Sequence, residues 1–338
     1  MNRQQITTLL SKGLFMGKPE KALLIETHIS WVLLAGDYAY KIKKPLKLSF
    51  LDFTTLSSRK KYCKEEVRLN QRLSKSIYLD VQPLTQQGST FQIGGAGKPI
   101  DYVVRMKRMD QSKLMNLQLK KNKVSASFIK DLAGLVSSFH KKQEPILKKY
   151  DPYFLSREFA DISGVAAKAK KIMGEKWLGD IKQCIAQSNR FVEAHEVLIR
   201  YRADSGNIRD VHGDLHTQNI FAYDKPVVFD CVEFKKEFRQ IDILNEVAFL
   251  CMDLEAMKRE DLSELFFNRY VQKMKLSKKD PELKDLFLYF KAYRACIRAK
   301  ISTIELLQHP EEKAVKRKVK TYTELMKRYL SDILPASQ

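Results

Sequence analysis

The sequence predicts an α+β protein of two lobes, in which a strand-rich first part is followed by a mostly helical second part. Between Ile25 and Met109, β-branched and apolar runs alternate with turn signals, and one helical pattern interrupts them. From Ser112 onward, apolar residues recur at spacings of three and four, as on one face of a helix. The 338 residues are enough to give two lobes a core each.

The first lobe is expected to begin with a short helix and a loop within residues 1–22. The apolar, β-branched run Ile25–Leu34 predicts one strand, and Ala35–Asp37 predicts the turn after it. Tyr38–Lys43 alternates as a return strand, and Phe53–Ser74 has helical periodicity. Further strands are expected where β-branched and aromatic residues gather: Val81–Leu84, Thr90–Ile93 and Asp101–Met109.

The second lobe is expected to be built mainly of helices. Ser125 is a suitable N-cap for the first long one. The helix candidates, each with an apolar stripe, are Ser125–Lys142, Phe159–Met173, Lys176–Arg202, Ile241–Met257, Asp261–Met274, Leu283–Gln308 and Glu311–Leu334.

The composition is that of an ordinary globular protein, with 44% hydrophobic and 30% charged residues. No apolar run approaches the roughly 18–20 residues of a membrane span, and the first residues lack a signal peptide's apolar core. We therefore expect a cytoplasmic protein without a membrane partner. The scattered cysteines, which form no CxxC pair, predict reduced thiols: Cys63, Cys184, Cys231, Cys251 and Cys296.

The net charge of +21 is compatible with nucleic acid, an anionic membrane or an anionic substrate as a partner. The basic residues are spread over the whole chain, and no stripe interleaves them with aromatic residues. A nucleic-acid partner is therefore not expected. A lysine-rich solvated surface would produce the same charge, so this alternative stays open.

The stretch that carries the chemistry is Val211–Phe234, which contains His212-x-Asp214-x4-Asn219 and then Asp230. Phosphoryl transfer needs one carboxylate at the acceptor hydroxyl, and an amide and a second carboxylate to hold Mg²⁺ on the phosphates. Asp214 and Asn219 have the Asp-to-Asn spacing of the protein-kinase catalytic loop.

A short hairpin is expected between Asn219 and Asp230. Phe221–Tyr223 and Val227–Phe229 are its two strands, around an Asp-Lys-Pro turn. This hairpin would return Asp230 to the side of Asn219, so that one metal ion could touch both.

A different class of site competes for the same loop. His212, Asp214 and His216 alternate, so in an extended segment all three would face one side, as the ligands of a hydrolytic metal can. The loop alone does not decide between a metal-dependent hydrolase and a kinase-like site.

The first lobe adds residues that only the kinase-like interpretation needs. On the strand Tyr38–Lys43, Ala39 leaves room for an adenine and Lys41 reaches the α- and β-phosphates. In kinase-like folds such a lysine pairs with a glutamate on the following helix. Glu66 fits this role better than Glu65, because Glu66 lies near the apolar face of that helix.

The change from strand to helix patterns predicts a hinge at Met106, Lys107 and Arg108, whose backbone groups would bind the adenine edge. The expected lobes are therefore residues 1–108, which bind the nucleotide, and residues 109–338, which carry the catalytic loop and the substrate site.

The loop His212–Asn219, HGDLHTQN, resembles the HGDLHxxN loop of the aminoglycoside phosphotransferase-like family, which shares the protein-kinase-like fold. Asp230, Lys41 and Glu66 fall where that family has its metal-binding Asp, its phosphate Lys and the partner of that Lys. Three longer stretches resemble an uncharacterised bacterial subgroup more specifically: ETHISWVLLAGDYAYKIKKP, LDFTTLSSRKKYCKEEVRLNQRL and FDCVEFKKEFRQIDILNEVAFLCMDLE.

The resemblance implies further roles. Ala35–Asp37 would be a short phosphate-covering turn, since the chain has no glycine-rich loop. Asp242 would tie the segment after Asp230 to its lobe, and His212 would brace the catalytic loop. Cys231 and Val232 stand where protein kinases have Phe-Gly, so no activation-segment switch is implied.

We therefore expect a phosphotransferase that uses ATP and Mg²⁺ to phosphorylate a hydroxyl group of a small molecule. The positive net charge of the chain is compatible with an anionic small molecule. Asp214 and Asn219 would be catalytic, and Asn219 and Asp230 would bind the metal. A catalytically idle, nucleotide-binding module is the main alternative. The hydrolase is less favoured because it needs neither Lys41 nor Glu66. The sequence predicts neither the acceptor nor the oligomeric state.

Overall fold

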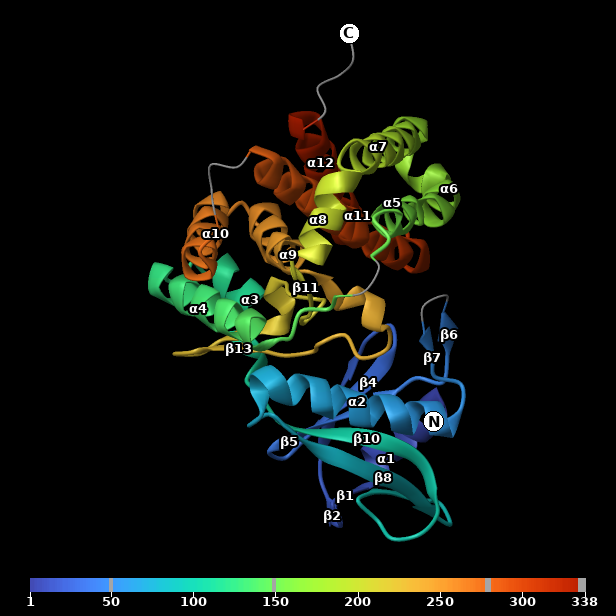
Figure 1. Ribbon diagram of the computed structural model, residues 1–338. Helices are drawn as coiled ribbons and strands as arrows, with labels where there is room; N and C mark the ends of the chain where they lie inside the picture. Colours follow the sequence, from blue (N-terminus) through green and yellow to red (C-terminus); the bar gives the residue numbers. More distant parts are fainter. Residues whose placement is uncertain (49–50, 148–149, 277–280, 334–338) are drawn as a thin grey trace. The chain divides into compact units, whose positions relative to one another are not determined.

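The computed structural model describes residues 1–48, 51–147, 150–276 and 281–333 (Figure 1). Two compact units are present. Unit 1 comprises Met1–Leu117, Asn219–Tyr223 and Val227–Phe238, and unit 2 comprises Gln118–Gln218, Asp224–Pro226 and Arg239–Gln338. Unit 1 contains the large β-sheet and unit 2 is mostly helical, so the predicted α+β, protein-kinase-like class is confirmed.

The described part of unit 1 contains a sheet with the strand order β2-β1-β9-β8-β10-β5-β4-β3. Its strands are β1 (Leu14–Phe15), β2 (Lys18–Pro19), β3 (Ala22–Glu26), β4 (Ser30–Ala35), β5 (Tyr38–Lys43), β8 (Tyr78–Gln87), β9 (Thr90–Ile93) and β10 (Pro99–Lys107). Neighbouring strands are antiparallel except β1 and β9. The other elements are α1 (Arg3–Lys12), α2 (Leu56–Ser74), β6 (Lys47–Leu48), β7 (Leu51–Asp52), and the hairpin strands β12 (Ile220–Ala222) and β13 (Pro226–Val228).

Alternation along the strands gives unit 1 two apolar layers. On β5, Tyr40 and Ile42 pack into a cluster that includes residues of α1, whereas Ala39 packs with Cys63 of α2. Period-two alternation therefore puts Lys41 and Lys43 on the same face as Ala39, the face that α2 covers. The predicted strand Tyr38–Lys43 is confirmed residue for residue.

The expectation of a single strand over Ile25–Leu34 is wrong. β3 ends at Glu26 and β4 begins at Ser30, with a tight turn between them. Ser30 N donates to Thr27 Oγ1 at 3.0 Å, and Thr27 N donates to Ser30 O at 2.9 Å. A hydroxyl side chain thus closes this turn without glycine or proline, which is why the sequence pattern hid it.

Unit 2 is organised around α9 (Ile243–Ala256), whose residues are buried through its first three turns. Such a helix, apolar nearly all round, is the expected centre of a helical unit. The other helices, coloured from green to red in Figure 1, are α4 (Ala126–Lys142), α5 (Tyr153–Ala160), α6 (Ile162–Met173), α7 (Glu175–Ala194), α8 (Glu196–Asp204), α10 (Glu260–Met274), α11 (Pro281–Gln308) and α12 (Lys313–Ile333). The short helix α3 (Met115–Lys120) follows the strand-rich part, and β11 (Ile208–Asp210) pairs with β14 (Gln240–Asp242).

The predicted helices are present, with two subdivisions. The candidate Phe159–Met173 contains the break between α5 and α6, and Lys176–Arg202 is broken at His195 into α7 and α8. The predicted end at Leu334 lies outside the described residues.

Two observations concern the expected location. Within the described residues, every helix is too short or too polar to cross a bilayer. The cysteines of the described chain are all buried free thiols.

Candidate active site

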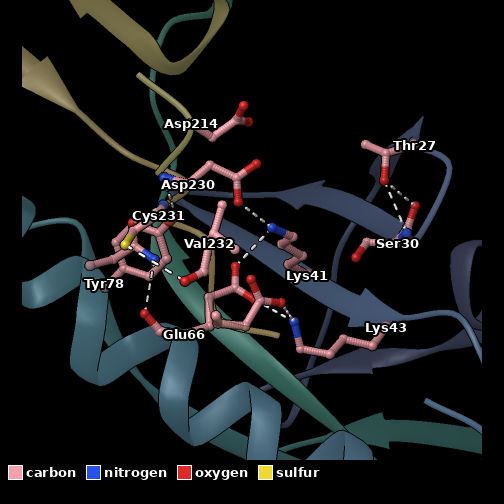
Figure 2. Close-up of polar contacts among 12 residues, drawn as sticks. Thr27, Ser30, Lys41, Lys43, Glu66, Tyr78, Asp214, Asp230, Cys231 and Val232 are labelled. Carbon is pink, nitrogen blue, oxygen red and sulfur yellow. Dashed lines mark hydrogen bonds and ion pairs between the residues drawn. The ribbon is translucent and has the colours of Figure 1, made fainter. Parts of the chain in front are cut away.

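Lys41 of β5 lies between two carboxylates of unit 1 (Figure 2). Lys41 Nζ is 2.8 Å from Glu66 Oε1 and donates to Asp230 Oδ1 at 2.6 Å. Desolvation lowers the pKa of Lys41, but Asp230 and Glu66 outweigh it and raise this pKa well above its ordinary value. Desolvation likewise raises the pKa of Glu66, but Lys41 and Lys43 outweigh it and lower this pKa to about 2. The site therefore holds a charged lysine against the ionised carboxylate of Glu66.

The segment that carries Asp230 is fastened to unit 1 by backbone hydrogen bonds. Asp230 N donates to Tyr78 Oη at 3.1 Å, and Cys231 N donates to Asn70 Oδ1 at 2.9 Å. Asp230 has a φ of +64°, a left-handed conformation that is uncommon for residues other than glycine. Such conformations persist where the surroundings impose them, and they gather at functional sites. The Asp230 side chain remains 40% exposed.

Asn219 is returned to the vicinity of Asp230 by the predicted hairpin. Phe229 N donates to Asn219 O at 3.0 Å, across the pair formed by β12 and β13. The hairpin is confirmed, with strand ends shifted by one residue from the prediction. A carboxylate and a side-chain amide offer oxygen ligands of the hard type that Mg²⁺ prefers, so Asn219 and Asp230 fit this ion.

The predicted hinge residues end strand β10 and continue past it. Met106 pairs with Ala39 in the sheet. Lys107 N donates to Ile77 O at 2.8 Å, and Arg108 N donates to Asp37 O at 2.8 Å. Because these two N–H groups are already satisfied within unit 1, recognition of an adenine edge here would depend on other backbone groups of the stretch.

The turn Ala35–Asp37 lies at the hinge end of β5, where Tyr38 pairs with Lys107. The turn between Thr27 and Ser30 lies at the opposite end, where Ser30 pairs with Lys43. Lys41 lies between the two ends of β5. Figure 2 shows the turn of Thr27 and Ser30 beside the side chains of Lys41 and Lys43.

In unit 2, the loop that contains Asp214 is held by two carboxylates of α9. Gly213 N donates to Glu246 Oε2 at 2.6 Å. Thr217 donates to Asp253 Oδ2 twice, from N at 2.9 Å and from Oγ1 at 2.6 Å. Glu246 and Asp253 are seven positions apart and therefore lie on one face of the helix.

Sequence reasoning missed Glu246 and Asp253. The available signal was the presence of two acidic side chains, two turns apart, in an otherwise apolar helix. Arg294 of α11 was also missed; its Nη1 donates to Gly213 O at 3.2 Å, so the loop is held from a second helix as well.

Asp214 itself is ionised and accessible. Desolvation raises its pKa, but His216, Arg298 and His212 outweigh it and hold the pKa of Asp214 well below its ordinary range. His216 Nε2 lies 3.3 Å from Asp214 Oδ2, and the Asp214 side chain is 39% exposed. A carboxylate in this state can accept a hydrogen bond from a hydroxyl group.

The two histidines of the loop serve its backbone. Asp214 N donates to His212 Nδ1 and Gln218 N donates to His216 Nδ1, both at 3.2 Å. One ring nitrogen of each histidine is thus occupied. In the described part of the chain, no three His, Cys, Asp or Glu side chains converge as metal ligands would. The geometry of these groups therefore does not support the hydrolase alternative.

Asp242 fixes the start of α9. Its carboxylate binds Arg202 Nε and Nη2 at 2.6 and 2.9 Å, and it accepts from Leu244 N at 2.8 Å. Within unit 2, Asp242 therefore connects α8 to the helix that carries Glu246 and Asp253.

Solved structures of small-molecule kinases have a similar fold. A choline kinase from Cryptosporidium parvum Iowa II matches with a TM-score of 0.60 and 12% identity, covering 94% of this chain and 92% of the kinase. A thermostable mutant of aminoglycoside phosphotransferase APH(4)-Ia matches with a TM-score of 0.55 and 10% identity over 98% and 99% of the two chains. Spectinomycin phosphotransferase APH(9)-Ia, in complex with ADP and spectinomycin, matches with a TM-score of 0.52, 12% identity and coverages of 97% and 99%. The chain thus has the protein-kinase-like fold in the form shared by aminoglycoside phosphotransferases and choline kinases.

Sequence relatives place the chain beside uncharacterised bacterial proteins. Proteins of Mycobacterium tuberculosis and Mycobacterium bovis are each 31% identical over 294 residues, which are 86% of this chain and 56% of the relative. The chain therefore spans about half the length of the curated relatives it matches. No family model matches the chain.

Proposed function

We propose that the protein is an ATP-dependent phosphotransferase that acts on a hydroxyl group of a small molecule. The observation that carries the proposal is Lys41, a buried cation held between Glu66 and the accessible Asp230. Phosphoryl transfer from ATP requires this kind of cation beside a metal-binding carboxylate. A fold neighbour that is a phosphotransferase with bound ADP supports it.

The strand register supports the proposed nucleotide roles. Ala39 pairs with Met106 and is small enough to leave room for an adenine ring near the hinge residues 106–108. Two residues further on, Lys41 would exchange its contact with Asp230 for the α- and β-phosphates, and Glu66 would keep it in place. Asn219 and Asp230 would hold Mg²⁺, which supplies positive charge at the phosphate oxygens.

We propose that the phosphate-covering turn is residues 27–30 and not Ala35–Asp37. Going from Ala39 to Lys41 leads away from the hinge end and toward the end where Ser30 pairs with Lys43. Among the described residues, the buried Ser30 Oγ has no hydrogen-bond partner, so a phosphate oxygen could accept from it.

Asp214 would orient the acceptor hydroxyl. As the oxygen–phosphorus bond forms and the bond from the γ-phosphorus to ADP breaks, the hydroxyl proton passes to the Asp214 carboxylate. In this proposal, residues 1–108 bind the nucleotide and residues 109–338 bind the acceptor. Arg298, which helps to lower the pKa of Asp214, favours an acceptor without excess positive charge.

The test is acceptor-dependent release of ADP. The purified protein with Mg-ATP is screened against sugars, amino alcohols, nucleosides, hydroxy acids and aminoglycosides. We expect at least one acceptor to accelerate ADP release in the wild type and not in Asp214→Asn. Binding of Mg-ATP with equal, slow hydrolysis in both proteins would favour the idle nucleotide-binding module.

A further inference from the structure

We propose that Lys43 and Glu233 are positioning residues: a second buried lysine–glutamate pair that orients Glu66 and thereby sets Lys41 and Asp230 for the nucleotide. The inference rests on the proposed function, because it concerns the same phosphate site. Lys43 lies two residues after Lys41 on β5 and therefore faces the same side of the sheet. Figure 2 shows both lysines directed at the Glu66 carboxylate.

The Glu66 carboxylate is divided between the two lysines. Its Oε1 lies 2.8 Å from Lys41 Nζ, and its Oε2 accepts from Lys43 Nζ at 2.6 Å. A carboxylate held at one oxygen can still rotate, whereas one held at both has a fixed plane. The orientation of Glu66 therefore depends on Lys43 as well as on Lys41.

Lys43 is in turn fixed on two sides. Lys43 Nζ donates to Glu233 Oε1 and lies 4.9 Å from the centre of the Phe53 ring. The side chains of Lys43 and Glu66 are 0% exposed and that of Glu233 is 4% exposed. Water therefore cannot substitute for any of these contacts.

Glu233 links this network to the metal-binding segment. It lies three residues after Asp230. Between them, Cys231 N donates a hydrogen bond to Asn70 Oδ1, and Asn70 lies one turn after Glu66 on α2. Asn70 Nδ2 also donates to Glu66 O at 2.9 Å. The segment is thus attached to β5 through Glu233 and to α2 through Cys231, and its accessible carboxylate, Asp230, is left for the ligand.

Stability alone gives a weak reason for this arrangement. Desolvation opposes each buried charge, and apolar side chains of similar size are often equally stabilising in place of a buried ion pair. Lys41 and Glu66 would already form an ion pair without the second pair. A requirement for position explains the additional charges: without Lys43, Glu66 and Glu233 would both compete for Lys41 and draw it away from the phosphates.

The test compares matched substitutions by calorimetric titration with Mg-ATP and by thermal unfolding. The variants are Lys43→Met, Glu233→Gln and the double variant Lys43→Met/Glu233→Met, with Lys41→Met as the reference for loss of the phosphate lysine. We expect the double variant to unfold within a few degrees of the wild type, because both charges of the pair are removed together. Its affinity for Mg-ATP should nevertheless fall about tenfold, within the coupling range of contacting residues.

Lys43→Arg provides the rescue, since it keeps the charge and should recover part of the affinity that Lys43→Met loses. Wild-type affinity in Lys43→Met or in the double variant would overturn the inference. If the double variant fails to fold, Glu233→Gln decides alone: unchanged Mg-ATP affinity in this variant overturns the inference.

An increased Mg²⁺ requirement confined to Glu233→Gln would also overturn it, because Glu233 would then be a metal ligand. The proposed function fails separately, if the wild type itself binds no Mg-ATP.

Discussion

Asp253 offers a strong test of the claim that α9 holds the loop that contains Asp214. The residue is 3% exposed, and its carboxylate accepts from three donors: Thr217 N, Thr217 Oγ1 and Tyr322 Oη, at 2.9, 2.6 and 3.1 Å. Hydrogen bonds to a charged group contribute about 1.5–3 kcal/mol each and do not add, while breaking a buried charged network costs about 3–5 kcal/mol. We expect Asp253→Ala to lower the free energy of unfolding by about 4 kcal/mol.

The assay is urea unfolding at pH 7, followed by circular dichroism. Asp131→Asn is the matched control: Asp131 and its partner Lys225 are 45% and 81% exposed, so their ion pair should contribute about 0–1 kcal/mol. A loss below about 1 kcal/mol for Asp253→Ala would refute the view that this carboxylate holds the loop.

Asp253→Asn separates charge from shape. Desolvation raises the pKa of Asp253, but Arg298, His216 and Thr217 outweigh it and lower this pKa from its ordinary value. A lowered folded-state pKa gives stability that is present above the unfolded value, about 4, and is lost as the pH falls through the folded value. The stability difference between wild type and Asp253→Asn should therefore be greatest at neutral pH and shrink below about pH 4. A difference independent of pH would show that the charge is not the stabilising feature.

Three further outcomes follow from the proposed roles. Asp214→Asn should lower turnover by about 10²–10⁴-fold while leaving Mg-ATP affinity, measured by calorimetry, unchanged; equal turnover would remove Asp214 as the base. Mg-ATP at about 100 times its dissociation constant should stabilise the wild type by about 2.7 kcal/mol. Asp230→Ala should abolish the Mg²⁺-dependent part of the shift in melting temperature. Zinc alone should not reproduce this shift in the wild type. Ser30→Ala should weaken Mg-ATP binding several-fold, as expected for a lost hydrogen bond of about 1 kcal/mol. Asp37→Ala, in the other turn, should bind Mg-ATP normally. Weaker binding in Asp37→Ala and normal binding in Ser30→Ala would return the phosphate-covering role to residues 35–37.

The structural features that depend on neighbouring residues in the sequence could be predicted. Tyr38–Lys43 shows the period of a strand, and Glu66 lies on the apolar side of a periodic helix, so the Lys41–Glu66 pair was expected and is present. The turn at Thr27 was missed because it lacks glycine and proline, and the adjacent apolar residues continue the strand pattern.

Contacts between distant segments could not be predicted in the same way. Lys43 and Glu233 are 190 residues apart, and Asp253 is 36 residues from Thr217. Asp253 and Glu246 also bind backbone N–H groups, which every residue except proline offers. Apart from the hydroxyl of Thr217, the donors in the loop are therefore not specific to a residue type, and the packing of α9 identifies which carboxylates they bind.

The lowered pKa of Asp214 limits what this carboxylate can do. A group that is ionised well below neutral pH is a weak base, so it cannot remove the proton of an unreacted alcohol to a useful extent. In the proposed reaction it would take that proton once the oxygen has begun to bond to phosphorus, because the alcohol then becomes strongly acidic. This timing suits a loose transition state, in which the attacking oxygen carries little charge until late. Catalysis would then depend mainly on where Asp214 is held, which makes Glu246, Asp253 and Arg294 as important to turnover as the carboxylate they position.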